Sequence, residues 1–596
     1  MTNPNPVETL KAQVHGEASE HNAINCLLNC YIREYAAANG EVAFGAELRE
    51  APTILAPAVR RGELLVCIRL TAIGCQLLIA ADRVSCLGRC RFLGKPFLQT
   101  RGQGWQAVGA ETLCRLLLQN LSRVLSVNFD DELVEQVKNS IETTRLFLCG
   151  QKASQRPEDD FIRSEQRLLW GHAMHPSPKS RQGVSAEALL ACSPELSAQF
   201  QLYWFEVDPQ LIECSGEAAG HYPPSLTGLH RRQGYLYPCH PWEAPRLLGH
   251  PLLEAAMARQ LIKPLGTLGE ALSPTSSVRT LYHPELPQQL KFSIHVRLTN
   301  CIRKNAWYEL ESAVFLSGIL KPLRRATQAT LPGFHLMLEP LATTLDFSRL
   351  ARAEKLPGAE QCREAFGILY RENFTPEQIS RYSPTLAASL FTWNEGGESI
   401  AYQRIRENRL NSGKSYGEEA AAWFSDYVAA LLPGTLYYLF KFGVVFEPHL
   451  QNTLIGFRGG RPCCVWIRDL EGTKLLPEHW PEQQLSALSP RARGAVYYDR
   501  QQGWKRIAYC LLVNNFSEAI FHLATGDRQL EEHLWQRLGH AIRRWQLRHG
   551  AEPELQELLA GAGLPHKNNL TTRLLKHPDR MADYSSLPNP LLGVAV

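Results

Sequence analysis

The sequence predicts a mixed α/β (α+β) protein that is built from about three lobes. The chain has 596 residues, which is too many for a single hydrophobic core. Its apolar content of 44% and charged content of 20% are those of a globular protein. Segments with helical spacing and segments with strand-like alternation both occur, in separate parts of the chain. We expect the lobes to cover residues 1–150, 151–380 and 381–596.

The first lobe is expected to combine helices with a small sheet. Helical spacing covers residues from about 5 to 35 and from about 110 to 150, while residues 51–94 alternate like a small set of strands. The polar stretch from Gly150 to Phe161 is typical of a seam between lobes.

The remainder is expected to mix strands and helices and then to become mainly helical. Residues 350–430 have a helical pattern, and amphipathic helices continue through about Leu559. Between them, residues 452–472 form a predicted strand pair, in which Gly459 and Gly460 suit a hairpin turn.

Charge and composition exclude several classes of partner. The net charge of +4 is small for this length, and no basic run, zinc-finger, RRM or helix-turn-helix signature occurs, so we expect no nucleic-acid partner. The polar N-terminus lacks a hydrophobic signal core, and charged residues interrupt the most apolar stretch, Ala420 to Phe446, so we expect no membrane segment. The sixteen cysteines lack paired CxxC spacing and are typical of reduced core residues in a cytoplasmic protein.

The stretch from Ser273 to Glu309 combines hydroxyl and basic side chains. Ser273, Thr275, Ser276, Ser277 and Thr280 surround Arg279, and Lys291, Arg297, Arg303 and Lys304 follow. Hydroxyls and amides can ring a phosphate, while Arg and Lys neutralise it. The pattern predicts a polyanion site, although a turn followed by a helix N-cap would explain the Ser/Thr cluster alone.

The basic part of this stretch alternates as a strand does. In KFSIHVRLTN the apolar residues fall on one side, and Lys291 and Arg297 would share the other. A solvated edge strand would show the same alternation, so the strand indicates a site only together with the hydroxyl cluster.

Two histidine-containing loops have different interpretations. In GHAMHPSPKSRQG, His172 or His175 together with Lys179 favours a phosphate or carboxylate contact, because no spacing supplies a third and fourth metal ligand. A surface loop with stray basic residues is the alternative. In YPCHPWE we expect a structural role, with Trp242 packed and His240 hydrogen bonded.

A second constellation surrounds the predicted hairpin. Its polar members are Glu447, His449, Gln451, Asn452, Asp469 and Glu471. The arrangement resembles the Asn and Asp that hold Mg²⁺ on nucleotide phosphates in protein kinases, although GxGxxG, HRD and DFG motifs are absent. Asn452, Asp469 and Glu447 offer the hard oxygen ligands that Mg²⁺ takes. Together with the polyanion stretch, they predict a Mg-ATP site between two lobes.

These blocks in their order resemble the IucA/IucC family of NRPS-independent siderophore synthetases, and the aerobactin-synthetase type in particular. The resemblance spans roughly residues 170 to 591 and rests on GHAMHPSPKSRQG, YPCHPWE, LSPTSSVRTLY, KFSIHVRLTNCIRKN, EPHLQNTL, RDLEGT, KNNLTTRL and NPL. Ala173 stands where the first loop of the family usually has Pro. The first 150 residues carry no motif of this strength.

The resemblance implies a cupped hand of thumb, fingers and a distantly kinase-like palm, which uses ATP and Mg²⁺ to adenylate a carboxylate, citrate above all, before an amine or alcohol displaces AMP. It implies a homodimer as well. It further implies phosphate contacts from Ser277, Arg279, Thr280, Lys291, Arg303 and either His172 or His175. Glu447, His449, Gln451, Asn452 and Asp469 would form the nucleotide, metal and carboxylate side of the cleft.

The chemistry assigns further roles. Arg303, with Arg279 and Lys291, would offset the charge that builds on the α-phosphate, and His449 or Glu447 is the candidate base for the amine. A phosphotransferase with a kinase-like site and a non-catalytic polyanion-binding homologue are the two alternatives. Release of ADP would mark the first, and ATP binding without turnover the second.

Overall fold

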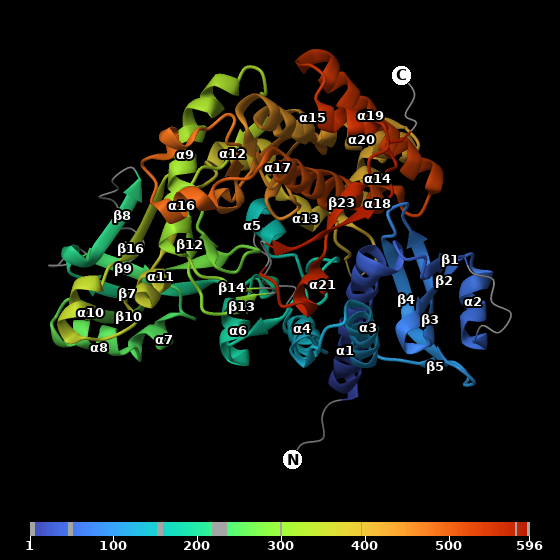
Figure 1. Ribbon diagram of the computed structural model, residues 1–596, viewed down its shortest axis with the longest axis horizontal. Helices are drawn as coiled ribbons and strands as arrows, with labels where there is room; N and C mark the ends of the chain where they lie inside the picture. The colour runs from blue at the N-terminus through green and yellow to red at the C-terminus, as the bar shows by residue number, and fades with distance from the viewer. Residues whose placement is uncertain are drawn as a thin grey trace.

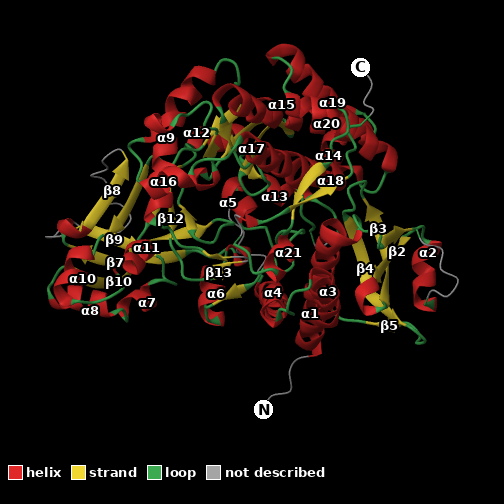
Figure 2. Cartoon of the chain, viewed as in Figure 1, coloured by secondary structure: helices red, strands yellow, loops and turns green. Residues whose placement is uncertain are grey.

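A computed structural model describes residues 6–45, 52–151, 159–216, 235–298, 301–394, 396–578 and 581–592. The mixed α/β class is confirmed. Figure 1 shows a small N-terminal lobe in blue, a middle lobe around a long sheet in green, and a helical C-terminal lobe in orange and red that lies over both. Helices dominate the upper part of the view, and strands lie mainly at its two lower sides (Figure 2).

The N-terminal lobe packs two long helices on a five-stranded antiparallel sheet, and a third long helix packs against the first of them (Figure 1). The sheet has the order β1-β2-β3-β4-β5. Its elements are α1 (Pro6–Tyr31), a π-helix η1 (Ile32–Ala36), β1 (Val42–Phe44), α2 (Ala56–Arg60), β2 (Leu64–Leu70), β3 (Cys75–Val84), β4 (Cys90–Thr100), β5 (Gln106–Ala107), α3 (Ala110–Leu125) and α4 (Asp131–Gly150).

Amphipathic spacing explains how α3 docks on this sheet. Leu113, Leu117 and Leu121 recur every fourth residue and are fully buried. The expected helices and most of the expected strands are confirmed, whereas the strand expected over Ala56–Arg60 is wrong. There Pro57, near the start of the segment, begins a short helix, because proline suits the first turn of a helix and lacks the N–H that a strand needs.

The middle lobe is built on an eight-stranded sheet whose neighbours are all antiparallel. Its order is β8-β16-β17-β12-β11-β10-β7-β9. The lobe comprises α5 (Asp160–Glu165), β6 (Arg181–Gln182), α6 (Ala186–Cys192), β7 (Phe200–Val207), β8 (Ile212–Gly216), β9 (Tyr235–Cys239), α7 (Ala244–Leu248), α8 (Pro251–Ala258), β10 (Ile262–Pro274), β11 (Thr280–Tyr282), β12 (Gln288–Phe292), β13 (Arg297–Leu298), β14 (Cys301–Ile302), β16 (Leu341–Leu345), α10 (Ser348–Glu354), α11 (Ala359–Ala365), β17 (Ile368–Glu372) and α12 (Pro376–Tyr382).

The basic strand is shorter than its alternation indicates. Strand β12 ends at Phe292, because the N–H of Ser293 turns to the carbonyl of Gly367 and that of Ile294 to the carbonyl of Arg303. Lys291 is therefore buried in the sheet, while Arg297 lies half-exposed in β13 and pairs with Glu132 of α4. The expectation that Lys291 and Arg297 share one strand face is wrong.

The C-terminal lobe has the largest core, which packs helices on a four-stranded sheet of order β15-β21-β20-β18. Its elements are α9 (Trp307–Thr327), β15 (Phe334–Leu336), β18 (Thr385–Leu386), α13 (Ala387–Leu390), α14 (Ile400–Ser412), α15 (Tyr416–Phe442), β19 (Val444–Val445), β20 (Thr453–Arg458), β21 (Arg461–Ile467), β22 (Lys474–Leu475), α16 (Pro490–Ala495), α17 (Arg500–Ile507), a π-helix η10 (Ala508–Phe516), α18 (Ser517–Ala524), α19 (Arg528–His549), α20 (Pro553–Leu559), β23 (Leu564–Lys567), α21 (Asn569–Leu574) and β24 (Tyr584–Leu587).

The hairpin expected at Gly459 and Gly460 is confirmed. These glycines join β20 to β21, and their φ angles of 57° and 75° are those of a two-residue turn that favours glycine. Strand β15 pairs with β21, and α9 packs in the same core. The core of this lobe therefore takes up residues well before the boundary expected near 380.

One helical path crosses the middle of the C-terminal lobe. Residues Arg500–Ala524 form the one stretch, among the described residues, that is long and apolar enough to cross a membrane. Its most apolar window is entirely buried inside the protein, as in a core helix. Helix α15, which contains the apolar stretch noted in the sequence, continues through Pro433 and Gly434. Gly434 is needed there because a Cβ would lie 2.1 Å from the ring of Phe334.

The two ends of the chain meet through a buried carboxylate. Glu34 of η1 accepts hydrogen bonds from the backbone N–H groups of Asn569, Leu570 and Thr571 at 2.8, 2.8 and 2.9 Å. These are the unpaired donors of the first turn of α21, which a carboxylate satisfies well. Burial nevertheless raises the pKa of Glu34 to about 7. The N-terminal core also includes Leu570 and Leu574 of α21.

Candidate active site

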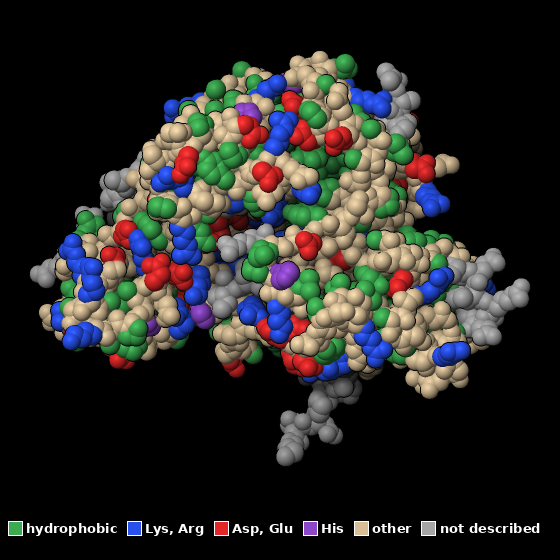
Figure 3. All heavy atoms as spheres, in the orientation of Figure 1, with side chains coloured by type: hydrophobic (Ala, Val, Ile, Leu, Met, Phe, Trp, Pro, Cys, Tyr) green, Lys and Arg blue, Asp and Glu red, His purple; other side chains and the backbone are tan. Residues whose placement is uncertain are grey.

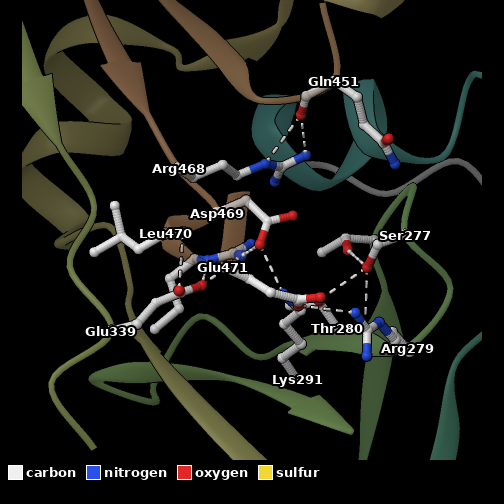
Figure 4. A network of polar contacts seen from close by, with 12 residues as sticks. Ser277, Arg279, Thr280, Lys291, Glu339, Gln451, Arg468, Asp469, Leu470 and Glu471 are labelled. Carbon is white, nitrogen blue, oxygen red and sulfur yellow. Dashed lines mark hydrogen bonds and ion pairs between the residues drawn. The ribbon is translucent and has the colours of Figure 1, made fainter. Parts of the chain in front are cut away.

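The basic stretch and the acidic hairpin meet where the middle and C-terminal lobes join. The ammonium of Lys291 in β12 donates to Asp469 Oδ1 at 2.6 Å and to Glu471 Oε2 at 2.8 Å (Figure 4). Asp469 and Glu471 follow β21, so the two sheets contribute opposite charges to one cluster. This is the proximity that a site between two lobes requires.

A hydroxyl-rich turn lies beside this cluster. Ser277 Oγ donates to Thr280 Oγ1 at 2.8 Å and accepts from the N–H of Thr280 at 3.1 Å. Arg279 donates to Glu471 Oε2 at 3.3 Å and to Asn305 Oδ1 at 2.5 Å. Val278 has a φ of 68°, which is strained for a β-branched residue, and strain of this kind concentrates at functional sites. Figure 4 shows Ser277, Arg279 and Thr280 on the same side of the cluster as Lys291.

Two fully buried ion pairs surround the acidic segment. Arg371 of β17 donates to Glu339 Oε1 at 2.9 and 2.6 Å, and Arg468 donates to the two oxygens of Glu165 at 2.6 and 3.1 Å. Arg371 also lies 3.5 Å from Asp469 Oδ1. The segment that contains Asp469 and Glu471 is thus flanked by two buried arginine–glutamate pairs.

The electrostatics of the cluster keep all of its members charged. Burial alone would lower the pKa of Lys291, but Asp469 and Glu471 raise it above its ordinary value. Burial would raise the pKa values of the two carboxyl groups, but Lys291 lowers that of Asp469 far below its ordinary range and that of Glu471 to about 2. Charges are therefore fixed in place before any substrate arrives.

The donor set suits a divalent cation. Asp469 and Glu471 both direct an oxygen at one positive charge, the ammonium of Lys291. Hard carboxylate oxygens that converge on a single charge are what Mg²⁺ prefers. Asp469 has φ 75° and ψ 76°, a left-handed conformation that is unusual outside glycine and turns its side chain toward Lys291.

The predicted metal ligands Asn452 and Glu447 flank Asp469 and Glu471. Asn452 is buried, and its carbonyl accepts the N–H of Arg468, the residue before Asp469. Glu447 pairs with Arg506 at 3.3 Å, and its carboxylate lies against Gly472, where a Cβ would come within 2.5 Å of Oε2. The metal roles of Asn452, Asp469 and Glu447 stay predictions.

The loop that carries His449 and Gln451 is held by a π-helix. Asn514 Oδ1 accepts the N–H of Leu450 at 3.0 Å, and Asn515 Nδ2 donates to the carbonyl of Pro448 at 2.9 Å. Both asparagines belong to η10, and π-helices are frequent at functional sites. Burial lowers the pKa of His449, so its imidazole is neutral at pH 7.

The histidine loop reaches the same π-helix. His172 Nε2 lies 2.7 Å from Asn514 Nδ2, and burial within the surrounding protein lowers the pKa of His172 to about 3. His172 is nevertheless solvent-accessible, whereas His175 is buried with its Nδ1 accepting the N–H of Ser177 at 3.2 Å. Accessibility therefore favours His172 over His175 as a ligand contact.

Lys179 and Arg303 are placed differently from the cluster residues. The ammonium of Lys179 is buried and donates to Glu195 Oε1 at 2.6 Å, beside Arg181. This placement is that of a structural ion pair and does not bring Lys179 to the Lys291 cluster. Arg303 lies between β14 and α9, with its carbonyl bonded to the N–H of Ile294. Contacts of Lys179 and Arg303 with phosphate stay predictions.

The cluster lines an open recess. The side chains of Asp469 and Glu471 remain 35% and 31% exposed although protein surrounds them. Figure 3 shows a hollow at the centre of this face, between the helical lobe above and the middle lobe below. The exposed fractions of Asp469 and Glu471 leave both carboxylates accessible to a small molecule.

The hydrogen bond and the packing expected for His240 are both present. Its Nδ1 accepts the N–H of Trp242 at 3.1 Å, and its ring packs against Phe200 and Trp242. Sequence reasoning missed Glu339, Arg371, Asn514 and Asn515. A signal existed for the two asparagines, since amides within the apolar run AYCLLVNNF are costly to bury without partners.

Two family models match the chain. The model described as "IucA / IucC family" matches residues 160–392, and the one described as "Ferric iron reductase FhuF-like transporter" matches residues 421–582. The chain is 29% identical to N(2)-citryl-N(6)-acetyl-N(6)-hydroxylysine synthase of Vibrio mimicus over 78% of this chain and 81% of that one. It is 27% identical to spermidine-citrate ligase of Bacillus anthracis over 97% and 98% of the two chains.

Solved structures share the fold. ATP-bound aerobactin synthetase IucA from Klebsiella pneumoniae superposes with a TM-score of 0.81 at 23% identity, over 96% of this chain and 99% of that one. Petrobactin biosynthesis protein AsbB from Bacillus anthracis gives 0.75 at 17% identity, over 99% and 98%. The fold and the charged recess thus define a protein with the architecture of the siderophore synthetases. The IucA/IucC family model matches residues 160–392 of the chain, and the similarity to spermidine-citrate ligase extends over nearly its whole length.

Proposed function

We propose that the protein is an ATP-dependent ligase that activates a carboxyl group of citrate and joins it to an amine or alcohol. The single observation that carries the proposal is the Lys291–Asp469–Glu471 cluster in an open recess. The cluster places two carboxylates, which are groups that bind divalent metals, beside basic side chains, which are groups that bind phosphate. Relatives that are named citrate ligases and synthases support both the reaction type and the substrate.

The reaction runs in two displacements. A carboxylate oxygen of citrate attacks the α-phosphorus of ATP, and pyrophosphate leaves. The amine nitrogen or alcohol oxygen then attacks the acyl carbon, AMP leaves, and the nucleophile loses a proton as the amide or ester forms. Activation is needed because a carboxylate is a poor electrophile at neutral pH.

The chain's own residues fit the charge changes of these steps. Lys291, Arg279 and Arg303 would offset negative charge on the phosphates and on citrate, while Ser277, Thr280 and His172 would hydrogen bond to them. His449 is neutral at pH 7 and could accept the proton that the nucleophile loses. Gln451, whose carbonyl accepts a hydrogen bond from Arg468, would lie on the nucleotide side of the recess.

Mg²⁺ is part of the proposal. Asp469 and Asn452, with Glu447 close by, would hold it, and when bound it would neutralise phosphate charge as a Lewis acid. We also propose that the enzyme is a homodimer and works in the cytoplasm, where thiols stay reduced. Fifteen of the sixteen cysteines are free in the structure, in keeping with this location; nothing is described of the side chain of Cys301.

Nucleotide-product analysis tests the function. Purified protein is incubated with Mg-ATP and hydroxylamine, and citrate, α-ketoglutarate and succinate are compared in parallel. We expect AMP, pyrophosphate and a hydroxamate with citrate. Formation of ADP without hydroxamate would instead establish a phosphotransferase, and ATP binding without turnover a non-catalytic homologue.

A further inference from the structure

The carboxylate of Glu339 is connected to Asp469 through two different residues, Arg371 and Leu470. Glu339 is fully buried in the segment between β15 and β16. Its Oε1 accepts two hydrogen bonds from Arg371, whose Nη2 lies 3.5 Å from Asp469 Oδ1. Its Oε2 accepts the N–H of Leu470 at 3.0 Å. Both oxygens of one buried group are thus used around a single residue, as Figure 4 shows for the bond to Leu470.

The bond to Leu470 acts on the backbone of Asp469. The peptide that joins Asp469 to Leu470 is oriented by the ψ angle of Asp469, which is 76° in combination with a φ of 75°. A conformation of this kind is unfavourable in a residue other than glycine and persists only when its surroundings hold it. Glu339 provides such a hold on the C-terminal side of Asp469.

The route through Arg371 acts on the side chain. Among the described residues, the hydrogen bonds and ion pairs of the Asp469 carboxylate go to Oδ1, from Lys291 and Arg371. Its Oδ2 is left open on a side chain that is 35% exposed to the recess. Arg371 cannot rotate away, because Glu339 fixes its guanidinium through a pair that is 3% and 0% exposed.

We propose that Glu339 and Arg371 are positioning residues, which hold Asp469 so that one carboxylate oxygen stays open to the metal of the ATP reaction. The inference rests on the proposed function. A positioning pair differs from a purely structural ion pair in one respect. A structural pair affects folding alone, and buried ion pairs are weak stabilisers. A positioning pair affects the metal-dependent part of nucleotide binding.

Binding of Mn²⁺·ATP to the full chain tests the proposal before any turnover is measured. Mn²⁺ is used because its paramagnetism reports bound metal directly. Glu339→Gln keeps an acceptor for the N–H of Leu470 and removes the charge that holds Arg371. We expect its Kd for Mn²⁺·ATP to rise at least about tenfold, while its affinity for metal-free ATP and its KM for citrate stay within about twofold of wild type.

A matched control, Glu372, lies next to Arg371 on strand β17. Glu372 accepts two hydrogen bonds from Arg324, at 2.6 and 3.0 Å, and one from the N–H of Leu338 at 3.1 Å. Neighbouring residues of a strand face opposite sides, so Glu372 repeats this chemistry away from Asp469. Glu372→Gln is expected to leave Mn²⁺·ATP affinity within about twofold. Equal losses in the two variants would overturn the proposal.

Arg371→Lys covers the case in which Glu339→Gln does not fold. It keeps the buried charge but loses the two-pronged contact with Glu339, so the same tenfold rise is expected. A wild-type affinity in Arg371→Lys would overturn the inference alone. A wild-type protein that binds no Mn²⁺·ATP would instead sink the proposed function, and the inference with it.

Discussion

Lys291 Nζ lies 2.6 Å from Asp469 Oδ1, although the two residues are 178 positions apart and belong to different lobes. Lys291 is 2% exposed, so its charge depends on the partner carboxylates. The ammonium therefore already neutralises part of the charge of Asp469 and Glu471. In the proposed reaction it would also contact phosphate, while the metal would bind the open Oδ2 of Asp469.

Replacing Lys291 should separate these two roles. We expect Lys291→Met to lower kcat/KM for ATP about 100-fold, because a charge that stabilises the transition state is lost. The same change should raise the affinity of the protein for free Mn²⁺ about tenfold, because Asp469 and Glu471 no longer share a cation. Metal titration without nucleotide measures the second effect. Unchanged metal affinity would show that the ammonium does not compete for the carboxylates.

Asp469→Asn should abolish turnover and preserve the fold. Its shape is kept, but a charged oxygen ligand is removed, so we expect citrate-dependent AMP release to fall at least about 100-fold. Glu471 still pairs with Lys291, so the circular dichroism spectrum should not change. Asp426 is the control. Like Asp469 it pairs with an arginine, but this arginine is Arg461 of β21. Asp426→Asn should keep activity within about twofold, and near-normal activity of Asp469→Asn would refute its metal role.

Arg303 should matter far more than an ordinary surface arginine. We expect Arg303→Ala to reduce kcat/KM about 100-fold, since it removes a predicted phosphate contact. Arg259 is the comparison, because it is 51% exposed and pairs with Glu354 at the surface. Arg259→Ala should have no measurable effect on steady-state rates. Similar rates for the two variants would remove Arg303 from the site.

His240 should make stability depend on pH. Burial lowers its pKa from 6.5 to about 3, so the folded protein keeps it neutral while the unfolded chain takes up a proton below pH 6.5. The stability that it contributes is complete above pH 6.5 and is lost as the pH falls. Between pH 7 and pH 5, we expect wild type to lose about 2 kcal/mol more unfolding free energy than His240→Gln.

Denaturant titration at both pH values measures this difference. The specific activity of the folded fraction of His240→Gln should stay close to that of wild type, because His240 packs in the core of the middle lobe. Parallel stability curves would mean that His240 has the same pKa in the folded protein as in the unfolded chain. A large loss of specific activity would move His240 into the active site.

Local chemistry explains which features the sequence predicted. The turn at Gly459 and Gly460 follows from the backbone angles that these residues adopt, and the helix α3 follows from its leucine spacing. The residue types of the site were also evident, because hydroxyl, basic and acidic side chains cluster in short segments. Such features depend on neighbours within a few positions.

Partners that are distant in sequence explain what was missed. Nothing near Glu339 indicates that its two oxygens bind Arg371 and Leu470. Nothing in the loop of Lys179 indicates that its ammonium pairs with Glu195. Lys291 and Arg297 were expected on one face of a single strand, whereas β12 ends at Phe292 and Arg297 lies in β13. These contacts join residues that are distant in sequence, so the local pattern does not indicate them.

The hydrogen bonds of Glu34 with Asn569, Leu570 and Thr571 have a consequence for biosynthesis. During translation Glu34 leaves the ribosome long before residues 569–571 are synthesised. Lobes generally fold in the order in which they are made. While the N-terminal lobe emerges, this carboxylate therefore stays hydrated. The lobe can complete its packing around Glu34 only after nearly the whole chain has been synthesised. A nascent protein that is cut short before α21 would keep a charged, unfinished seam that quality-control proteases can recognise.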